Sequence, residues 1–401
     1  MLFNGDTLGA HLADLGADVI KVESPAGGDY IRHFLGQITP GNSPAHVQIN
    51  RGKRSVTIDL HTESGREVFW RLLRDADVFV DGNASDAAGR LGIGYEDQRR
   101  RKPDIIYCQY TGFGAQGPYS AIPTHGQMMD ALAGAHPHML GDDGLMYPGG
   151  AQGLLANMSS GGEGTAAGAI HAAYHVAAAL FQRERTGEGA YIDVSGADGV
   201  IGQAWIAATY ALNEHRITDR RTLPAADNGE PTGSKYQYYE TKDGQAVLFC
   251  CIEDKFWRNF CSAVGDPALS GQCDPDGPGP VDFGADDIAL RHELQRVFHT
   301  RTLAEWMTLA ADNDFALGPA YRGMVEVARD PHIAVRDIVH VQEHPDVGEF
   351  TYIGEVGKVA GQPYSVSRPA PGHGEHTDEV LAEAGYGRAE LDALRKAKVI
   401  R

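Results

Sequence analysis

Residues 12–23 read LADLGADVIKVE, and this stretch decides how the first part of the chain folds. Apolar residues at helical spacing lead into Gly16, a residue type that ends helices, and an apolar run follows it. The pattern predicts a helix followed directly by a buried parallel strand. The helical apolar positions are Leu8, Leu12 and Leu15, and those of the strand are Val19, Ile20 and Val22.

Basic residues follow this strand closely; they are Arg32, Arg51, Lys53 and Arg54. Guanidinium and ammonium groups in such a set suit a ligand that is rich in phosphate. The alternative interpretation is that all four are solvated surface charges.

The composition limits the classes of protein to consider. The chain has 401 residues, 42% of them hydrophobic, which suits two domains. The formal net charge of -19 argues against a nucleic-acid or anionic-membrane partner, because either needs a basic face. The 5 cysteines lack CxxC spacing and predict no disulfide framework. Since neither a membrane span nor a signal peptide is recognisable, we expect a soluble cytoplasmic protein.

Strands and helices alternate along residues 1–200 and predict a doubly wound parallel sheet. We expect strands at 18–22, 78–80 and 105–110, and helices at about 7–15, 62–73 and 165–185. Thr62 is placed to cap its helix, and Gly187 is placed to end the longest one in the left-handed conformation. Residues 1–6 leave no room for a full strand, so we expect a shortened start or a strand stub.

A smaller α/β domain is predicted for residues 225–325. Segments 236–241 and 246–251 surround an Asp-Gly pair and predict a hairpin. Helices at 255–264 and 288–297 flank a stretch at 274–280 that is rich in proline and glycine. We therefore divide the chain into a first part of the large domain at 1–200, a linker at 201–224, the small domain at 225–325, and a return to the large domain at 326–401.

Four segments together resemble the family III CoA-transferase superfamily, which comprises CaiB/BaiF-type CoA-transferases and α-methylacyl-CoA racemases. They are residues 12–23, GDYIR at 28–32, NRGKRS at 50–55 and GEHTDEVL at 374–381. The resemblance implies a Rossmann-like large domain built from both chain ends, a small α/β domain and an interlocked homodimer. It implies acyl-CoA and a small carboxylic acid as substrates, with no permanently bound cofactor and no metal. The candidates for binding the phosphates of coenzyme A are Arg32, Arg51, Lys53 and Arg90.

Two further segments resemble parts of the racemases. PTHGQMMDALAG at 123–134 is similar to the segment with a catalytic histidine, here His125. An imidazole, with an ordinary pKa of about 6.5, suits proton transfer near neutral pH; the alternative is that His125 only caps a helix. IEDKFW at 252–257 is similar to the segment in which a glutamate, here Glu253, orients a catalytic side chain. Its alternative role is to stabilise a helix start by charge, with Asp254 as the possible cap.

The catalytic aspartate of the superfamily falls on Gly164 or Thr165, and neither is acidic. Glu163, which ends the sequence SSGGE at 159–163, is the substitute that we expect. A carboxylate at a helix start can attack an acyl-CoA carbonyl or carry a proton, while backbone N–H groups stabilise an oxyanion. The alternative is that Glu163 is an ordinary helix-start charge and the site is inactive.

The turn DGNASD at 81–86 also departs from the superfamily, whose members carry Asn-Phe-Arg-Pro-Gly there. It lacks the aromatic residue and the arginine, although Arg90 follows in a matching segment. No metal-ligand spacing, serine nucleophile elbow or dinucleotide fingerprint occurs.

Transfer of CoA between an acyl-CoA and a free carboxylic acid is the reaction that we favour, because one enzyme carboxylate suffices for it. Racemisation of an α-methylacyl-CoA by His125 and a carboxylate is the first alternative. A non-catalytic acyl-CoA-binding subunit is the second.

Overall fold

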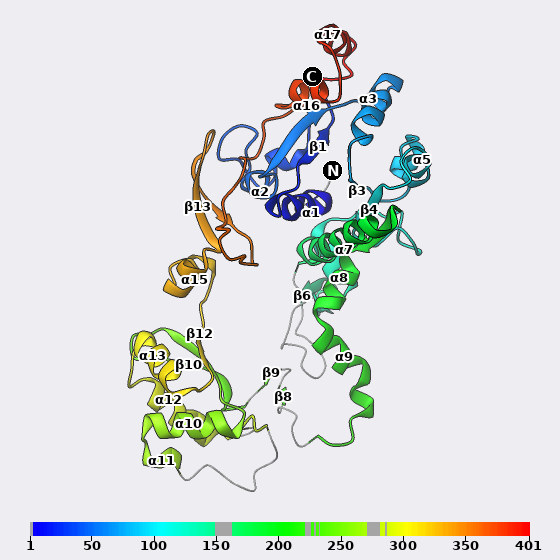
Figure 1. Cartoon of the computed structure of the whole chain (residues 1–401). Helices are drawn as coiled ribbons and strands as arrows, with labels where there is room; N and C mark the ends of the chain where they lie inside the picture. The colour runs from blue at the N-terminus through cyan, green and yellow to red at the C-terminus, as the bar shows by residue number, and fades with distance from the viewer. Residues whose placement is uncertain are drawn as a thin grey trace. The chain divides into compact units, whose positions relative to one another are not determined.

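The computed structural model describes residues 3–148, 163–220, 226–227, 230–231, 233–270, 281–284 and 287–401. The chain forms two compact units, both mixed α/β (Figure 1). The large unit comprises Met1–His136, Ser160–Ala204 and Ala334–Arg401, and the small unit comprises Pro137–Ser159 and Trp205–Ile333.

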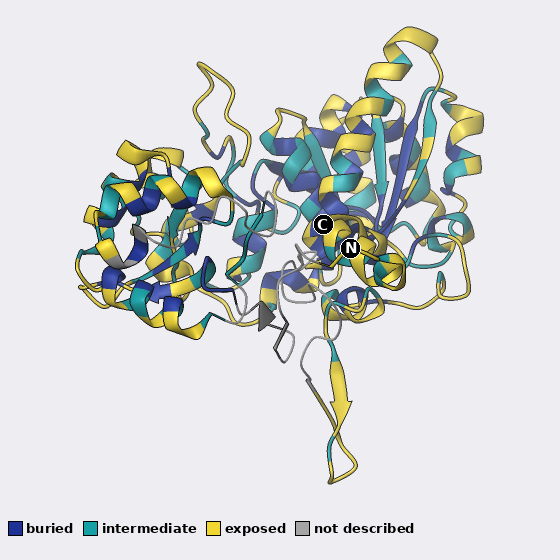
Figure 2. Ribbon diagram, turned by 90° about the horizontal axis from the view of Figure 1, so that it is seen from below, coloured by how far each residue is buried: buried dark blue, intermediate teal, exposed yellow. Residues whose placement is uncertain are grey.

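Parallel strands form the centre of the large unit. Strand β1 (Val19–Glu23) pairs with β2 (Lys53–Thr57). A second parallel sheet has the order β3 (Val78–Asp81), β4 (Ile106–Thr111) and β7 (Ala190–Ser195). Every residue of β2 and β4 is buried, as in parallel strands that are covered on both faces (Figure 2).

Helices connect and cover these strands. They are α1 (Phe3–Asp14), α2 (Pro44–Ile49), α3 (Glu63–Leu73), α4 (Ala87–Arg90), α5 (Tyr95–Arg101), α6 (Gly126–Leu132), α7 (Gly164–Thr186), α8 (Gly196–Gln203), α16 (Thr377–Glu383) and α17 (Arg388–Lys396). Two predicted helix ends are confirmed: the Thr62 hydroxyl accepts a hydrogen bond from Gly65 N at 3.0 Å, and Gly187 ends α7 with φ at 72°.

Helix α1 begins earlier than the sequence predicts, and residues 3–6 are helical, whereas a strand stub was one of the two alternatives that we expected. The reason is a buried ion pair between Asp6 in its first turn and Lys21 on β1, at 2.6 Å. An acidic side chain in the first turn also complements the helix dipole. Both effects favour helix at the start of the described chain.

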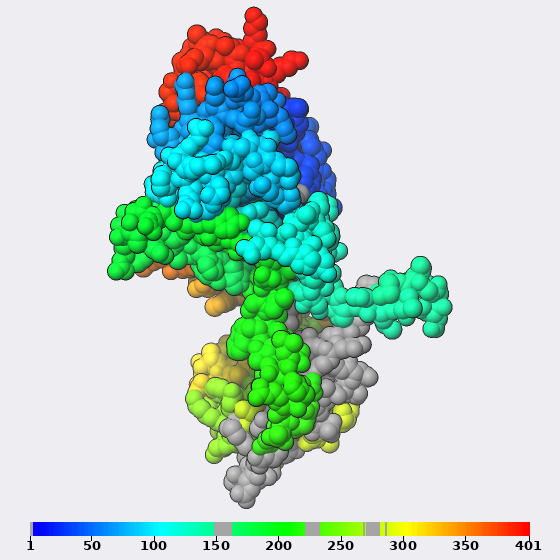
Figure 3. All heavy atoms as spheres, turned by 90° about the vertical axis from the view of Figure 1, so that its right-hand side faces the viewer, coloured from blue at the N-terminus to red at the C-terminus, as the bar shows by residue number. Residues whose placement is uncertain are grey.

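The two ends of the chain share one core in the large unit. Val56 and Ile58 near β2 pack against Val380 and Leu381 of α16. Figure 3 shows the blue N-terminal and red C-terminal segments lying together. The later segment also contributes the antiparallel pair β13 (Val339–His344) and β14 (Gly348–Ile353), preceded by α15 (Pro331–Arg336).

The small unit contains the predicted hairpin. Strands β10 (Tyr236–Glu240) and β11 (Ala246–Cys250) are antiparallel, and β12 (Leu317–Pro319) joins β11. Its helices are α9 (Trp205–Asn213), α10 (Asp254–Val264), α11 (Pro267–Ser270), α12 (Ile288–Phe298), α13 (Leu303–Asn313) and α14 (Met324–Val327). Two short antiparallel strand pairs are β5 (His138–Leu140) with β6 (Met146–Pro148) and β8 (Ala226–Asp227) with β9 (Glu230–Pro231). Most of the stretch predicted as a linker is helical, through Asn213. Residues 274–280 lie outside the described residues.

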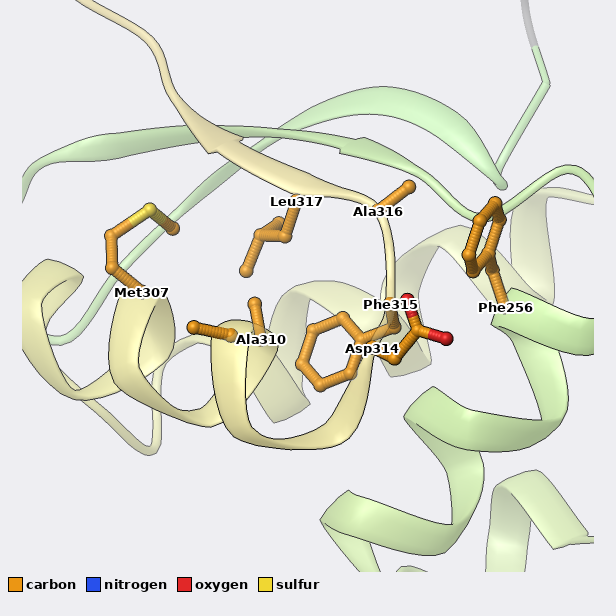
Figure 4. Close-up of a pocket in the computed structure, with 8 residues that line it drawn as sticks. Phe256, Met307, Ala310, Asp314, Phe315, Ala316 and Leu317 are labelled. Atoms are coloured by element: carbon orange, nitrogen blue, oxygen red, sulfur yellow. The ribbon is translucent and has the colours of Figure 1, made fainter.

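A hollow of about 390 Å³ opens on the small unit between α10, α13 and β12 (Figure 4). Its lining is apolar apart from Asp314, which pairs with Lys255 at 2.5 Å. None of its eight described lining residues is cationic. The hollow therefore has no group that suits a phosphate.

Candidate active site at the start of helix α7

Glu163 stands just before α7, where a helix leaves backbone N–H groups without helical partners. Its extended backbone directs the side chain over the first turn, and its carboxylate accepts hydrogen bonds from Thr165 N at 3.1 Å and Ala166 N at 3.3 Å. The residue is exposed. An accessible carboxylate thus lies beside two N–H donors, which are the groups that acyl transfer needs as nucleophile and oxyanion stabiliser.

Two buried side chains hold this first turn. Asp130 on α6 accepts a hydrogen bond from Gly164 N at 2.7 Å. The Tyr110 hydroxyl at the end of β4 donates to Thr165 O at 2.6 Å and Gly164 O at 3.0 Å. Burial, together with the nearby Glu163 charge, raises the pKa of Tyr110 well above its ordinary range, so the hydroxyl stays a donor. The start of α7 is therefore anchored through both its N–H and its carbonyl groups.

His125 lies at the start of the neighbouring helix α6 and is exposed. Among the described residues the His125 side chain makes no hydrogen bond that caps α6. Helix capping by this side chain therefore does not account for a histidine at this position. The next residue, Gly126, lies so close to Glu163 that a Cβ built there would be 2.8 Å from Glu163 Oε1. The structure therefore brings the backbone beside His125 and the Glu163 carboxylate together.

Packing explains why position 164 carries no acid. A Cβ on Gly164 would lie 2.6 Å from Met129 Cβ and 3.1 Å from Asp130 Oδ1. These distances exclude a side chain unless α6 moves. Thr165 is buried, so an acid there would take a charge out of water. Glu163 directly precedes these two positions, and its exposed carboxylate lies outside the packed contact.

Sequence reasoning missed Asp130 and Tyr110. Asp130 is 3% exposed and lies on the buried face of α6 together with Met129. A carboxylate on the buried face of a short helix was the available signal, since burial requires a partner for the charge. The partner, Gly164 N, comes from a distant part of the sequence, and that could not be predicted.

Glu253 belongs to the small unit and precedes α10 as its N-terminal cap residue. It is exposed, and among the described residues its side chain makes no capping hydrogen bond. Asp254 is the first residue of the helix and pairs with Arg258 one turn later. The role that the racemase resemblance gives to Glu253 stays a prediction.

Three of the four cations expected at a phosphate lie buried in ion pairs within the large unit. Arg32 pairs with Glu23 at 2.6 Å and also donates to Pro371 O at 2.9 Å. Arg51 pairs with Asp14 at 2.5 Å. Both guanidinium groups already have a carboxylate partner, and ligand contact by Arg32 and Arg51 stays a prediction.

Lys53 is the third buried cation and donates to Asp6 O at 2.7 Å and Asn50 Oδ1 at 2.8 Å. Burial lowers its pKa to about 8, against the opposing attraction of Asp6. Burial by itself would raise the pKa of Glu23, but the hydrogen bonds and the positive charge of Arg32 outweigh this effect and lower the pKa to about 2. The signature segments thus build an internal charge network that joins the first helix, β1 and β2.

The remaining candidate, Arg90, is exposed and donates to the Ser85 hydroxyl at 2.8 Å. It adjoins the turn at 81–86, in which the buried Asp81 accepts from the Tyr107 hydroxyl at 2.8 Å. At the end of β4, the buried Thr111 hydroxyl finds no partner among the described residues. Ligands of open parallel sheets bind beyond these carboxyl ends of the strands.

Within the described part of the chain no three side chains of the metal-ligating kinds gather into a cluster. None of the helices described there combines the length and apolar character needed to cross a bilayer.

The chain is similar to known proteins over most of its length. The family model described as CoA-transferase family III matches residues 1–377. The formyl-CoA:oxalate CoA-transferase of Bradyrhizobium diazoefficiens is 29% identical, over 98% of this chain and 93% of its own length. The succinyl-CoA:mesaconate CoA-transferase of Haloarcula hispanica is 31% identical, over 94% and 91%. A solved CAIB/BAIF family protein from Brucella suis superposes with a TM-score of 0.70 at 26% identity, covering 95% of both chains. The chain therefore belongs to CoA-transferase family III.

Proposed function

We propose that this enzyme transfers CoA from an acyl-CoA to a free carboxylic acid through the carboxylate of Glu163. The observation that carries the assignment is the exposed Glu163 carboxylate beside two backbone N–H groups at the start of α7. It also stands next to the sequence position where the family carries its aspartate.

The reaction follows from ordinary acyl chemistry. A Glu163 oxygen bonds to the thioester carbon, the C–S bond breaks, and a mixed anhydride and CoA thiolate result. The thiolate then attacks the glutamyl carbonyl, which releases the donor acid and leaves CoA on Glu163 as a thioester. The acceptor carboxylate attacks the carbonyl of this thioester, which releases CoA thiolate and forms a second mixed anhydride. The thiolate then attacks the acceptor carbonyl of that anhydride, which gives the new acyl-CoA and frees Glu163. Each tetrahedral step places negative charge on an oxygen that N–H donors stabilise.

Glu163→Gln tests the nucleophile. We expect the rate of CoA transfer to fall at least about 100-fold, because an amide does not form the anhydride. Glu188→Gln, at an exposed glutamate just beyond α7, is the matched control and should keep full activity. The assay combines acyl-CoAs with oxalate, mesaconate and other acids and follows new thioesters by mass spectrometry. Equal rates in the wild type and Glu163→Gln would contradict the assignment.

Racemisation is the second candidate, and the exposed His125 beside the Glu163 site favours it. The same assay in deuterated water distinguishes the reactions. Deuterium at the α-carbon without a new thioester would indicate a racemase, and neither product would indicate a non-catalytic binding subunit.

For the phosphates of CoA, Arg90 is the contact that we propose first, because it is exposed beside a strand end and its described partner is a hydroxyl. The proposal for Arg32, Arg51 and Lys53 requires their ion pairs to open, so we rank them below Arg90. Arg90→Ala should weaken CoA binding by roughly 1.5–3 kcal/mol. Calorimetry that finds unchanged affinity would remove Arg90 from the site.

We also propose that two copies of this Rossmann-like, doubly wound large unit interlock in a homodimer. The outward face of α7 supports this, because Ile170, Tyr174 and Phe181 are 48%, 49% and 68% exposed. The opposite face already packs on the core through residues such as Ala169 and Val176. A helix that is apolar on both faces is typical of a buried position.

A further inference from the structure

We propose that Asp130 is a positioning residue for CoA transfer, which anchors the start of α7 so that Glu163 is free to leave its capping position and react. The inference rests on the proposed role of Glu163. It concerns a buried carboxylate that no sequence motif singled out.

The capping position of Glu163 is not a reactive one. Both carboxylate oxygens accept backbone hydrogen bonds there, one from Thr165 N and one from Ala166 N. A carboxylate so engaged is a poorer nucleophile, and it occupies the two donors that an oxyanion would use. Attack on a thioester therefore requires the Glu163 side chain to swing away from the helix. This movement frees Thr165 N for the substrate oxygen, whereas Ala166 N keeps a second hydrogen bond, to Glu163 O at 3.0 Å.

Losing a capping side chain ordinarily weakens a helix start and lets the first turn fray. Here the turn keeps other anchors. Asp130 Oδ1 holds Gly164 N at 2.7 Å, and Tyr110 holds the carbonyls of residues 164 and 165. The first turn can thus stay in place while the Glu163 side chain moves, and Thr165 N keeps its position at the helix start.

Charge supports the same role. An anion is favoured at a helix N-terminus, and Glu163 loses its charge whenever it is acylated. Asp130 remains at this end of α7 throughout, with His136 Nε2 3.5 Å from its other oxygen. Its side chain is 5% exposed, so Asp130 supports the nucleophile and does not replace it. Since Asp130 is on α6, it also fixes α7 relative to Gly126 and His125.

The test compares Asp130→Leu, which removes the acceptor, with Asp130→Asn, which keeps an acceptor oxygen. We expect Asp130→Leu to lower kcat by roughly 10–100-fold with KM for acyl-CoA within about twofold of the wild type, and Asp130→Asn to recover most of the loss. The rate at which CoA becomes attached to Glu163, measured by mass spectrometry per folded enzyme, should fall in parallel. The proposal would be overturned if CoA became attached to Glu163 at the wild-type rate in Asp130→Leu.

Amide hydrogen exchange of α7 tests the proposal without a measurement of catalytic activity. The Gly164 amide should exchange at least about tenfold faster in Asp130→Leu and at a nearly unchanged rate in Glu163→Ala, because it donates to Asp130 and not to the Glu163 side chain. Fraying in Glu163→Ala would overturn the proposal even if Asp130→Leu fails to fold. If the wild type never carries CoA on Glu163, the proposed function fails, while the exchange arm still decides whether Asp130 anchors the helix.

Discussion

Glycine at position 126 leaves the room in which the Glu163 carboxylate stands. An alanine Cβ there would be 2.8 Å from Glu163 Oε1, and this neighbour is the end of a flexible side chain. We expect Gly126→Ala to fold with a Tm within about 2 °C of the wild type. We expect its kcat to fall roughly tenfold, because the added methyl group narrows the room in which the Glu163 side chain moves between its capping position and its reactive position.

Gly27→Ala is the matched control for this substitution, since a Cβ at Gly27 meets nothing within 4 Å. The measurements are steady-state kinetics and thermal unfolding of both variants. Wild-type kcat in Gly126→Ala would mean that the room beside Gly126 does not limit the reaction of Glu163.

At the scale of single elements, the exposed face of α7 makes a prediction about assembly. Phe181→Asp puts a charge at a position that is 68% exposed in the isolated chain and covered in the proposed dimer. Because burying an unpaired charge is costly, we expect the variant to dissociate or misfold where the wild type is dimeric. Light scattering over a concentration series measures this. A wild type that is a compact monomer at micromolar concentration would contradict the interlocked arrangement.

Local signals predicted individual elements well. The Thr62 and Gly187 ends of helices and the hairpin at Asp243-Gly244 depend on residues next to each other in sequence, and the structure confirms them. The candidate site depends on distant partners, and there prediction was weaker. Neither the Glu23 partner of Arg32 nor its contact with Pro371 O can be inferred from spacing, and the predicted ligand contact of Arg32 stays untested. Asp130 was missed for the same reason.

At the scale of the whole molecule, the buried charge network makes stability depend on pH through His46. This ring accepts from Arg32 at 3.0 Å and lies near Pro371 O at 3.2 Å, so it joins early and late parts of the chain. Burial, helped by the Arg32 charge, lowers the pKa of His46 from 6.5 to about 3. Between these values the unfolded chain binds a proton that the folded chain does not.

The unfolded state therefore gains protons as pH falls from 6.5 toward 3, and the free energy of unfolding decreases by up to about 1.4 kcal/mol per pH unit. The depressed pKa of Glu23 adds a further loss only below its ordinary value of 4.5. Urea denaturation at pH 7, 6 and 5 should show this slope in the wild type, and His46→Gln should flatten it. His33→Gln, at an exposed histidine, is the control. An unchanged slope in His46→Gln would show that another group is responsible.

The core shared by β2 and α16 has a consequence for synthesis on the ribosome. Arg54 and its partner Glu379 are 325 residues apart, so the first segment is made long before the residues that cover it. At about 5–20 residues per second this delay lasts roughly 15 to 65 seconds. During that time Val56 and Ile58 lack the side chains of α16 that cover them and are open to chaperones and proteases. Slowing of translation near the end of the message should accordingly lower the yield of this protein more than slowing near its beginning.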